Sequence, residues 1–470
     1  MNHPDHWTEA ELQDLGEWKT GSTPRRSRDD YWGGDILWVS PKDMKTNRIA
    51  ETEDRMTQKA LDETNSKLIP PDSIIIVTRS GILEHTLPVA INDKPVTINQ
   101  DLKALIPANS VNVEYLFYYL KSNEINILKN CTKDGTTVAS INSDSLYSYE
   151  IPIAPLAEQE QIVKKIGELL SKLDAGVSDL ETAGNKLHLY KRVQLNRALE
   201  GRLTNNIEEE IRHPALNIVD ESNLPETAPE LPRYWIWVRF ESMLTEPLRN
   251  GKSAKKAESG IRTLTLTAVT ERDFSEENSK ITEADPEQVE DLWLQSGDLL
   301  IERSNTEEYV GLPAVYRGED GYAIYPDLMI RARCDESIVS PEFADYMLLS
   351  PYFRNYLRGK SKGTSGSMAK INQKHLREMP FPLPPLDEQQ VIVERLDQIT
   401  SVVDQTIQDL EDEVERSGRL RQSIFDRAFD GELINFDEPN TSRRESQKKV
   451  ESNTDSAEQV TLTEVSGDVE

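Results

Sequence analysis

The chain has 470 residues, which is too long for one ordinary hydrophobic core and predicts two or three domains. Its 54 Lys and Arg residues against 83 Asp and Glu residues give a formal net charge of −29 at pH 7. This charge excludes a protein that holds nucleic acid through a globally basic surface, although a locally basic surface remains open. The acidity is compatible with a host that lives in high salt, and equally with an acidic linker and tail on an ordinary protein.

The sequence fits neither a membrane protein nor a protein that is stabilised by disulfides. Its longest apolar runs, such as Ile74–Val77, are far shorter than the roughly 18 residues that a membrane helix needs. The first residues lack the basic start and the apolar stretch of a secretory signal. Cys131 and Cys334 form neither a metal motif nor a disulfide framework. We therefore expect a soluble, cytoplasmic protein.

An internal repeat organises the chain. The segment PLAEQEQIV at 155–163 recurs as PLDEQQVIV at 385–393, and RALEGRL at 197–203 recurs as RAFDGEL at 427–433. Both pairs have the same offset, 385 − 155 and 427 − 197, which is 230 residues. A constant offset over separate segments indicates two copies of one unit.

Each copy contains a long amphipathic helix. Apolar residues recur every three or four positions, and they are Ile162, Ile166, Leu169, Leu173, Val177 and Leu180 in the first copy. The corresponding residues of the second copy are Ile392, Leu396, Ile399, Val403, Ile407, Leu410 and Val414. Acidic residues after a proline suit the start of each helix, and Gly201 and Gly431 suit its end. Neither helix can bury its apolar stripe alone, so the two are expected to pack together.

The regions before the helices carry short strand-like runs, such as Ile74–Val77, and one amphipathic helix each, at 113–122 and 341–350, which predicts mixed α/β structure. The predicted class is α+β: two mixed α/β domains separated by two long helices packed as an antiparallel coiled coil, with a pseudo-two-fold internal duplication. The predicted segments are domains at 1–154 and 231–383, long helices at 155–203 and 384–436, an acidic linker at 204–230 and a disordered acidic tail at 437–470.

These motifs resemble those of the specificity subunits of type I DNA restriction-modification systems. The resemblance is carried by the PL-x-EQ helix starts at Pro155 and Pro385 and by the R-A-x-x-G helix ends at Arg197 and Arg427. A Gly-Ser-Thr-Pro segment at 21–24, followed by Tyr31-Trp32, also contributes to the resemblance. In the second copy, Gly251-Lys252-Ser253 stands where a Gly-Ser/Thr-Pro segment is expected.

The resemblance implies a non-catalytic DNA reader. Each divergent region would be a target recognition domain that reads one half of a bipartite double-stranded DNA site. The helices would set the spacing and dock two modification (methyltransferase) subunits, and restriction (translocase-nuclease) subunits would join the complex. The resemblance implies no cofactor in this chain, with S-adenosylmethionine, ATP and Mg²⁺ in the partner subunits.

Two alternatives are a self-contained restriction-modification enzyme and a coiled-coil assembly protein that has lost DNA reading. The sequence lacks the glycine-rich loop and the Asn/Asp-Pro-Pro-aromatic motif of a methyltransferase. Gly251-Lys252-Ser253 resembles the end of a phosphate-binding loop, but Glu246 occupies the place of its first glycine. Asp72 and Glu84 bracket a strand-like run without the E-x-K of a nuclease. We therefore expect no catalytic residue and no metal site.

Basic and small polar residues on predicted loops are the candidates for DNA contact. Arg25, Arg26 and Arg28 follow a predicted exposed turn, and Arg79-Ser80 and Arg303-Ser304 follow the central strand of each half at places that we take to match. The full set is Thr23, Arg25, Arg26, Arg28, Lys42, Lys45, Arg79, Ser80, Lys133, Thr136, Thr137, Lys252, Lys255, Lys256, Arg303, Ser304, Lys360, Lys362, Ser367 and Lys370. For each residue the alternative is an ordinary solvated surface side chain.

Two further groups of residues have two interpretations each. The aromatic residues Tyr31, Trp32, Trp38, Trp235 and Trp237 either stack on bases or pack in a core, and their strand-like context favours the core. Recurring residues at the helix ends are candidates for binding partner subunits, namely Glu158, Gln159, Arg197, Glu388, Gln389 and Arg427. Shared capping and packing explains this recurrence equally well.

Overall fold

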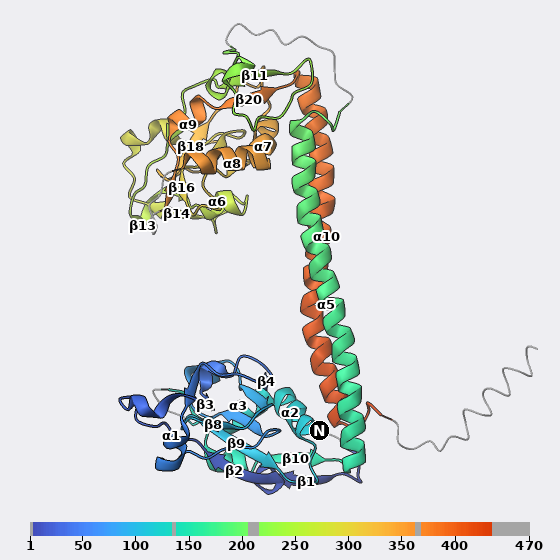
Figure 1. Ribbon diagram of the computed structural model, residues 1–470. Coiled ribbons are helices and arrows are strands. Elements are labelled where there is room, and N and C mark those ends of the chain that lie inside the picture. Colours follow the sequence, from blue (N-terminus) through green and yellow to red (C-terminus); the bar gives the residue numbers. More distant parts are fainter. Residues whose placement is uncertain (1–2, 134–137, 205–215, 362–367, 435–470) are drawn as a thin grey trace, which may run out of the picture. The chain divides into compact units, whose positions relative to one another are not determined.

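The computed structural model describes residues 3–133, 138–204, 216–361 and 368–434 (Figure 1). The chain divides into two compact units, Met1–Asp179 with Glu413–Glu470 and Leu180–Asp412. Each unit contains one mixed α/β region and a part of both long helices. The predicted linker is described only at residue 204 and from residue 216 onward, and the predicted tail lies outside the described residues.

The first unit is built on a five-stranded sheet with strand order β2-β9-β6-β7-β4. These strands are β2 (Gly16–Thr20), β9 (Leu102–Pro107), β6 (Ile74–Val77), β7 (Val89–Asn92) and β4 (Arg48–Ile49). A three-stranded sheet contains β5 (Asp54–Met56), β3 (Trp32–Val39) and β8 (Val96–Ile98), and a third sheet pairs β1 (Thr8–Glu11) with β10 (Glu150–Ile153). The short helices are α1 (Gln58–Glu63), α2 (Val113–Ser122), α3 (Glu124–Cys131) and α4 (Ser143–Tyr147).

The second unit is built on a four-stranded sheet with strand order β12-β18-β15-β17. These strands are β12 (Arg249–Asn250), β18 (Met329–Ala332), β15 (Leu299–Glu302) and β17 (Pro313–Val315). Three strand pairs accompany it: β13 (Lys256–Leu264) with β14 (Ser279–Thr282), β16 (Ser304–Asn305) with β19 (Ala369–Lys370), and β11 (Ile236–Arg239) with β20 (Pro380–Leu383). The short helices are α6 (Thr267–Thr270), α7 (Pro341–Leu349), α8 (Pro351–Lys360) and α9 (Gln373–Arg377).

The long helices are α5 (Leu156–Leu199) and α10 (Leu386–Phe429), and they run antiparallel within each unit. In the first unit the start of α5 packs with the end of α10, where Ile162 and Ile166 share a core with Phe425. In the second unit the end of α5 packs with the start of α10, where Leu195 and Leu199 share a core with Ile392 and Leu396. The prediction of two mixed regions with two long antiparallel helices is confirmed. Among the described residues, no helix is both long enough and apolar enough to cross a membrane.

Each helix end is closed by the predicted glycine. Gly201 and Gly431 have φ values of 65° and 74°, a left-handed conformation that glycine adopts without a Cβ penalty. Both also receive a proline from the same unit. A Cβ at Gly201 would lie 2.3 Å from Pro232 Cγ, and a Cβ at Gly431 would lie 2.3 Å from Pro4 Cγ.

A buried glutamine ties the first turn of each long helix to the neighbouring mixed region. Gln159 accepts from the backbone N–H of Asn112 and donates to the carbonyl groups of Ser110 and Ala154. Gln389 makes the same three bonds, to the N–H of Ser340 and to the carbonyl groups of Ile338 and Pro384. Both glutamines are fully buried, and in each the amide oxygen and the amide nitrogen form their hydrogen bonds within the unit.

The glutamate before each glutamine accepts from a tryptophan. Trp7 Nε1 donates to Glu158 at 3.0 Å, and Trp235 Nε1 donates to Glu388 at 3.0 Å. Each tryptophan ends a Pro-x-x-Trp segment, at 4–7 and 232–235, whose proline is the one that packs on the glycine of the helix end. The prediction from sequence overlooked these two segments, although their recurrence after 228 residues, 232 − 4, was visible in it.

These contacts correct part of the predicted partner-binding set. Gln159, Glu388 and Gln389 are fully buried, so another subunit cannot reach their side chains in this structure. Their recurrence reflects shared packing of the helix start on its own unit. Arg197 and Arg427 are exposed, whereas the Glu158 carboxylate is 15% exposed and also pairs with His6.

Trp235→Phe should lower the free energy of unfolding by about 1–3 kcal/mol, because it removes the indole donor of a buried carboxylate. Trp7→Phe is the matched control and should cost less, since Glu158 is partly exposed and keeps its contact with His6. Urea unfolding of the full chain measures both variants. Equal costs would contradict a special role for the burial of Glu388.

Candidate nucleic-acid interface

In the first unit, three loops lie side by side at the ends of the strands. Gly21 packs so closely on the next loop that a Cβ would lie 2.0 Å from the carbonyl oxygen of Asn99. The Ser22 N–H donates to Ile98 O at 2.9 Å, and the Thr23 hydroxyl donates to Gln100. The Thr78 N–H then joins this second loop to a third, because it donates to Asp101 O at 2.8 Å. We call these loops the first loop edge.

The second unit builds the same arrangement, which we call the second loop edge. A Cβ at Gly251 would lie 2.2 Å from the carbonyl oxygen of Pro326. The Lys252 N–H donates to Tyr325 O at 3.0 Å, and the Ser253 hydroxyl donates to Asp327. Gly251-Lys252-Ser253 therefore occupies the place that Gly21-Ser22-Thr23 occupies in the first unit.

Two of the three arginines after Thr23 are held by neighbouring side chains. Arg26 pairs with Asp54 at 2.7 Å, and its guanidinium lies 4.0 Å from the centre of the Trp32 ring. Arg28 pairs with Asp30 at 2.5 Å and stacks on Tyr31. Hydrogen bonds from Arg28 and then Lys59 lower the pKa of Asp30, and the bond to Asp30 raises the pKa of Arg28.

Arg25 differs, because it is exposed and no side chain of the described ranges pairs with it. Its backbone carbonyl accepts from Trp32 Nε1 at 3.3 Å, and Trp38 Nε1 donates to Ser22 O at 3.2 Å. The two indoles thus hold the loop, while the Arg25 side chain has no partner in the part of the chain that the structure describes. Of the three arginines, Arg25 is the one available for a ligand.

The aromatic residues mostly pack inside, as the strand-like context predicted. Tyr31, Trp38, Trp235 and Trp237 have exposed fractions of 3–6%, and Trp32 is half-buried against Trp38. The four buried rings therefore cannot stack on bases in this structure.

The predicted match between Arg79-Ser80 and Arg303-Ser304 is wrong by one residue. The backbone N–H groups of Thr78 and Arg79 both donate to Asp101 O. The corresponding donors to Leu328 O in the second unit are the N–H groups of Arg303 and Ser304. Arg79 therefore matches Ser304, and Arg303 matches the buried Thr78.

This shift changes the role of two candidates. Ser304 is fully buried, so its side chain cannot reach a ligand in this structure, and its predicted DNA contact is corrected. The Arg303 guanidinium donates to Asp327 O at 2.9 Å and so stabilises the second loop edge. Ser80 caps a short helical turn by accepting from the Ile82 N–H.

The remaining basic candidates divide into paired and unpaired side chains. Lys45 lies 3.7 Å from Glu53, Lys252 donates to Gln288, and the Lys360 ammonium lies 5.5 Å from the centre of the Tyr356 ring. The exposed side chains for which the described residues offer no hydrogen-bond or ion-pair partner are Lys42, Lys133, Lys255, Lys256 and Lys370. The candidates Thr136, Thr137, Lys362 and Ser367 lie outside the described residues.

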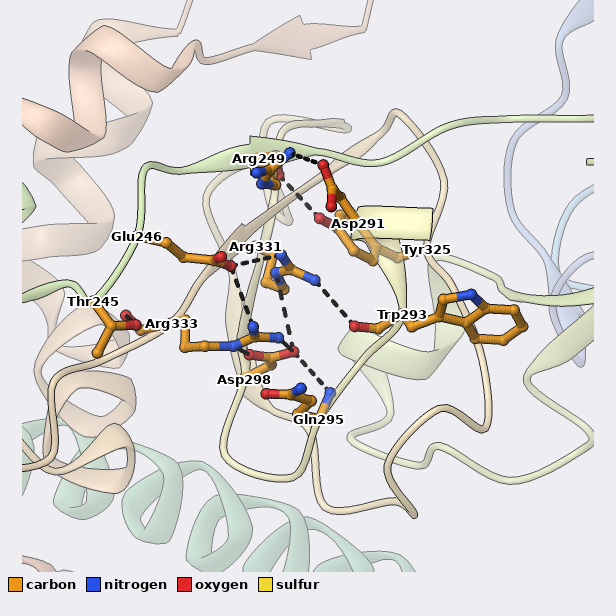
Figure 2. A network of polar contacts seen from close by, with 10 residues as sticks. All are labelled: Thr245, Glu246, Arg249, Asp291, Trp293, Gln295, Asp298, Tyr325, Arg331 and Arg333. Atoms are coloured by element: carbon orange, nitrogen blue, oxygen red, sulfur yellow. Dashed lines mark hydrogen bonds and ion pairs between the residues drawn. The ribbon is translucent and has the colours of Figure 1, made fainter. Parts of the chain in front are cut away.

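Three further arginines are neutralised inside the second unit, as Figure 2 shows. Arg333 forms two bonds with Asp298, at 2.7 and 2.9 Å. Arg331, of which 2% of the side chain is exposed, donates to Glu246 at 2.6 Å and to Trp293 O at 3.1 Å. Arg249 pairs with Asp291 at 2.9 Å, directly before the Gly251 loop. This network stabilises the base of the second loop edge and leaves the positive charge to its lysines.

Glu302 is a buried carboxylate beside the second loop edge. It ends β15, at the place of the apolar Val77 in β6, and Asn305 donates to its Oε2 atom. Its Oε1 atom is buried, and no described residue offers it a hydrogen bond. Burial raises the pKa of Glu302 to about 7, an effect that the bond from Asn305 and the charge of Arg354 partly oppose.

In the described ranges, no group of three or more His, Cys, Asp or Glu side chains could hold a metal ion. The duplicated fold instead carries one loop edge in each unit, with unpaired cations at or near it. The two loop edges therefore share a backbone arrangement and differ in their side chains.

Comparison with known proteins identifies the family of this chain. The family model for the type I restriction modification DNA specificity domain matches residues 4–187 and 274–416, together more than half of the chain. The chain is 27% identical over 445 residues to the specificity subunit of the type I restriction enzyme EcoKI of Escherichia coli K12, across 92% of this chain and 90% of that protein. It is 41% identical over 164 residues to the EcoR124I/EcoR124II specificity subunit of Escherichia coli, across 35% of this chain and 40% of that protein.

Solved structures agree on the fold. A chain from a study of complex assembly and conformational transition of the type I restriction-modification system has a TM-score of 0.66 at 19% identity, covering 92% of this chain and all of that chain. The HsdS subunit from Thermoanaerobacter tengcongensis has a TM-score of 0.53 at 18% identity, covering 92% and 98%. The chain belongs to the family of type I restriction modification DNA specificity proteins. The resemblance inferred from the helix-start and helix-end motifs is thereby confirmed.

Arg25→Ala should weaken DNA binding by the assembled complex by about 1–3 kcal/mol, because it removes an exposed, unpaired cation. Arg26→Ala is the contrasting variant. It should lower the free energy of unfolding by about 0.5–1 kcal/mol through loss of the cation–π contact with Trp32. Gel-shift titration and urea unfolding of both variants separate the two roles, and a purely structural effect of Arg25→Ala would contradict this assignment.

Glu302→Gln should remove a pH-dependent part of the stability. The folded-state pKa of about 7 lies above the usual glutamate pKa of 4.5, so the wild-type chain loses stability as the pH rises through this range. The variant should gain about 1 kcal/mol or more over wild type at pH 8, and the gain should shrink toward pH 5. Urea unfolding across this range measures the effect, with the exposed Glu307→Gln as the control; equal pH profiles for Glu302→Gln and wild type would contradict the role of Glu302.

Proposed function

We propose that the chain is the DNA sequence-specificity subunit of a type I restriction-modification complex. In this proposal, residues 1–154 read one half of a bipartite double-stranded DNA site and residues 231–383 read the other half. The observation that carries the proposal is the loop edge built twice on the same backbone frame, with different cations in each copy. Different side chains on one frame predict different half-site sequences.

The long helices would set the spacing between the half-sites and dock two methyltransferase subunits. Support comes from residues that stay exposed in both copies. Arg197 and Arg427 are exposed on the last turns of the helices, and Leu156 and Leu386 are each 40% exposed on the first turns. Repeated exposed residues suit two copies of one partner.

We further propose that the chain is not catalytic and works in the cytoplasm. The relatives are specificity subunits by name, and the chain lacks the sequence motifs of a methyltransferase, a phosphate-binding loop or a nuclease. S-adenosylmethionine, ATP and Mg²⁺ would then belong to the methyltransferase and restriction subunits. Positive charge from the partners would also offset the net charge of −29, which by itself weakens association with DNA.

Methylome sequencing of cells that contain the methyltransferase subunit, with and without this chain, tests the proposal. Cells with the chain should show a split motif that is absent from cells without it. Replacement of residues 1–154 by the corresponding region of another family member should change one half of the motif, and replacement of 231–383 should change the other.

The two alternatives give different results in the same experiment. A methylated motif in cells that lack the methyltransferase subunit would favour a self-contained enzyme. Assembly of the subunits without any motif would favour a protein that has lost DNA reading.

A further inference from the structure

Each loop edge contains one residue of a short cross-strand pair. In the first unit, Arg79 faces Ser140 in an antiparallel bridge. The Ile141 N–H donates to Thr78 O at 2.8 Å and fixes this register. In the second unit, Ser304 faces Lys370 in the pairing of β16 with β19, and the Ile371 N–H donates to Arg303 O at 3.0 Å. The two pairs therefore occupy the same place in the fold.

The cation and the serine have exchanged strands between the two pairs. The first unit has Arg79 on the strand that leaves the central sheet and Ser140 on the returning strand. The second unit has Ser304 on the leaving strand and Lys370 on the returning strand. Directly opposed residues of antiparallel strands have Cβ atoms about 4.5–5.5 Å apart and share one face, so a long side chain from either strand reaches the same space.

Neither exchanged cation has a side-chain partner among the described residues. Arg79 and Lys370 are exposed, and the described part of the chain provides no side-chain hydrogen bond or ion pair for either. The neighbouring Arg26 and Arg28 are held by carboxylates, and Arg303 by a backbone carbonyl. The chain has 83 acidic residues, yet each unit has at this same place one cation that no described residue pairs.

We propose that this cross-strand pair is an equivalent DNA-contact position in both units, with Arg79 as the contacting cation of the first and Lys370 as that of the second. The proposal rests on the proposed function, because it assigns residues to DNA reading. It requires one cation in each pair, on the leaving strand in the first unit and on the returning strand in the second. The two cations differ in chemistry: a guanidinium can bond the O6 and N7 atoms of a guanine in pairs, whereas an ammonium acts as a point charge.

The first arm of the test neutralises each cation. Arg79→Ser and Lys370→Ser are each tested in the full chain assembled with its methyltransferase subunit. Each should weaken binding to DNA that contains the split motif about tenfold. Lys94→Ser is the matched control, because Lys94 is an exposed cation of the first unit that is already paired with Glu51 at 2.7 Å. It lies before β8, at the end opposite the turn that follows Ile98. This control should keep wild-type affinity.

The second arm moves the cation across the strands. The double variant Arg79→Ser with Ser140→Lys gives the first unit the arrangement of the second, and it should recover most of the affinity lost in Arg79→Ser. Ser140→Lys alone shows whether an added charge strengthens binding without regard to position. Circular dichroism and urea unfolding confirm that each variant is folded.

Full binding by folded Arg79→Ser and Lys370→Ser would overturn the proposal, as would a folded double variant that recovers nothing. A wild-type complex without any split motif would instead refute the proposed function, so the two failures are distinguishable.

Discussion

The structure depends on the burial of one glutamine amide at the start of each long helix. Gln159 and Gln389 each satisfy three backbone groups, one of them at the N-cap of the neighbouring helix α2 or α7. A buried amide with every bond made fixes the angle at which the chain enters the long helix, because any displacement leaves polar groups unpaired. In each unit a Pro-x-x-Trp segment then links the two long helices. Its tryptophan bonds to the glutamate in the first turn of one helix, and its proline packs on the glycine at the end of the other. Each mixed region is thereby held on a helix pair rather than on a flexible tether.

In this acidic chain, some cations are neutralised by nearby carboxylates and others are left unpaired by the described residues. In the second unit Arg333, Arg331 and Arg249 pair with Asp298, Glu246 and Asp291. In the first unit Arg26 and Arg28 pair with Asp54 and Asp30. Such pairs stabilise loops while presenting little net field to a ligand. The unpaired cations, Arg25 and Arg79 among them, are therefore the side chains that can attract an anionic surface. This division explains how a chain with a net charge of −29 can still belong to a family of DNA specificity proteins.

The two loop edges share backbone contacts and differ in side chains. Gly21 and Gly251 make the same close approach to a neighbouring loop, where any side chain would collide with a carbonyl oxygen. Around this constant frame, Val77 is replaced by Glu302, and Arg79 by Ser304. The backbone hydrogen bonds are the same in both units, whereas the side chains around them differ. Under the proposed function, a constant frame with different side chains suits the reading of two half-sites of different sequence.

Much of the architecture was readable from the sequence, because periodicity and repetition are local or linear properties. The apolar spacing predicted α5 and α10, the glycines at 201 and 431 predicted their ends, and Ile74–Val77 and Val113–Ser122 were predicted with their observed bounds. The sequence also determined the duplication and the family. Only the tertiary structure decided which cations are paired, that Gln159 and Gln389 face inward, and that Arg79 matches Ser304 rather than Arg303. Those outcomes depend on contacts between residues far apart in the chain, and on a strand register in which a shift of one residue turns every side chain to the opposite face.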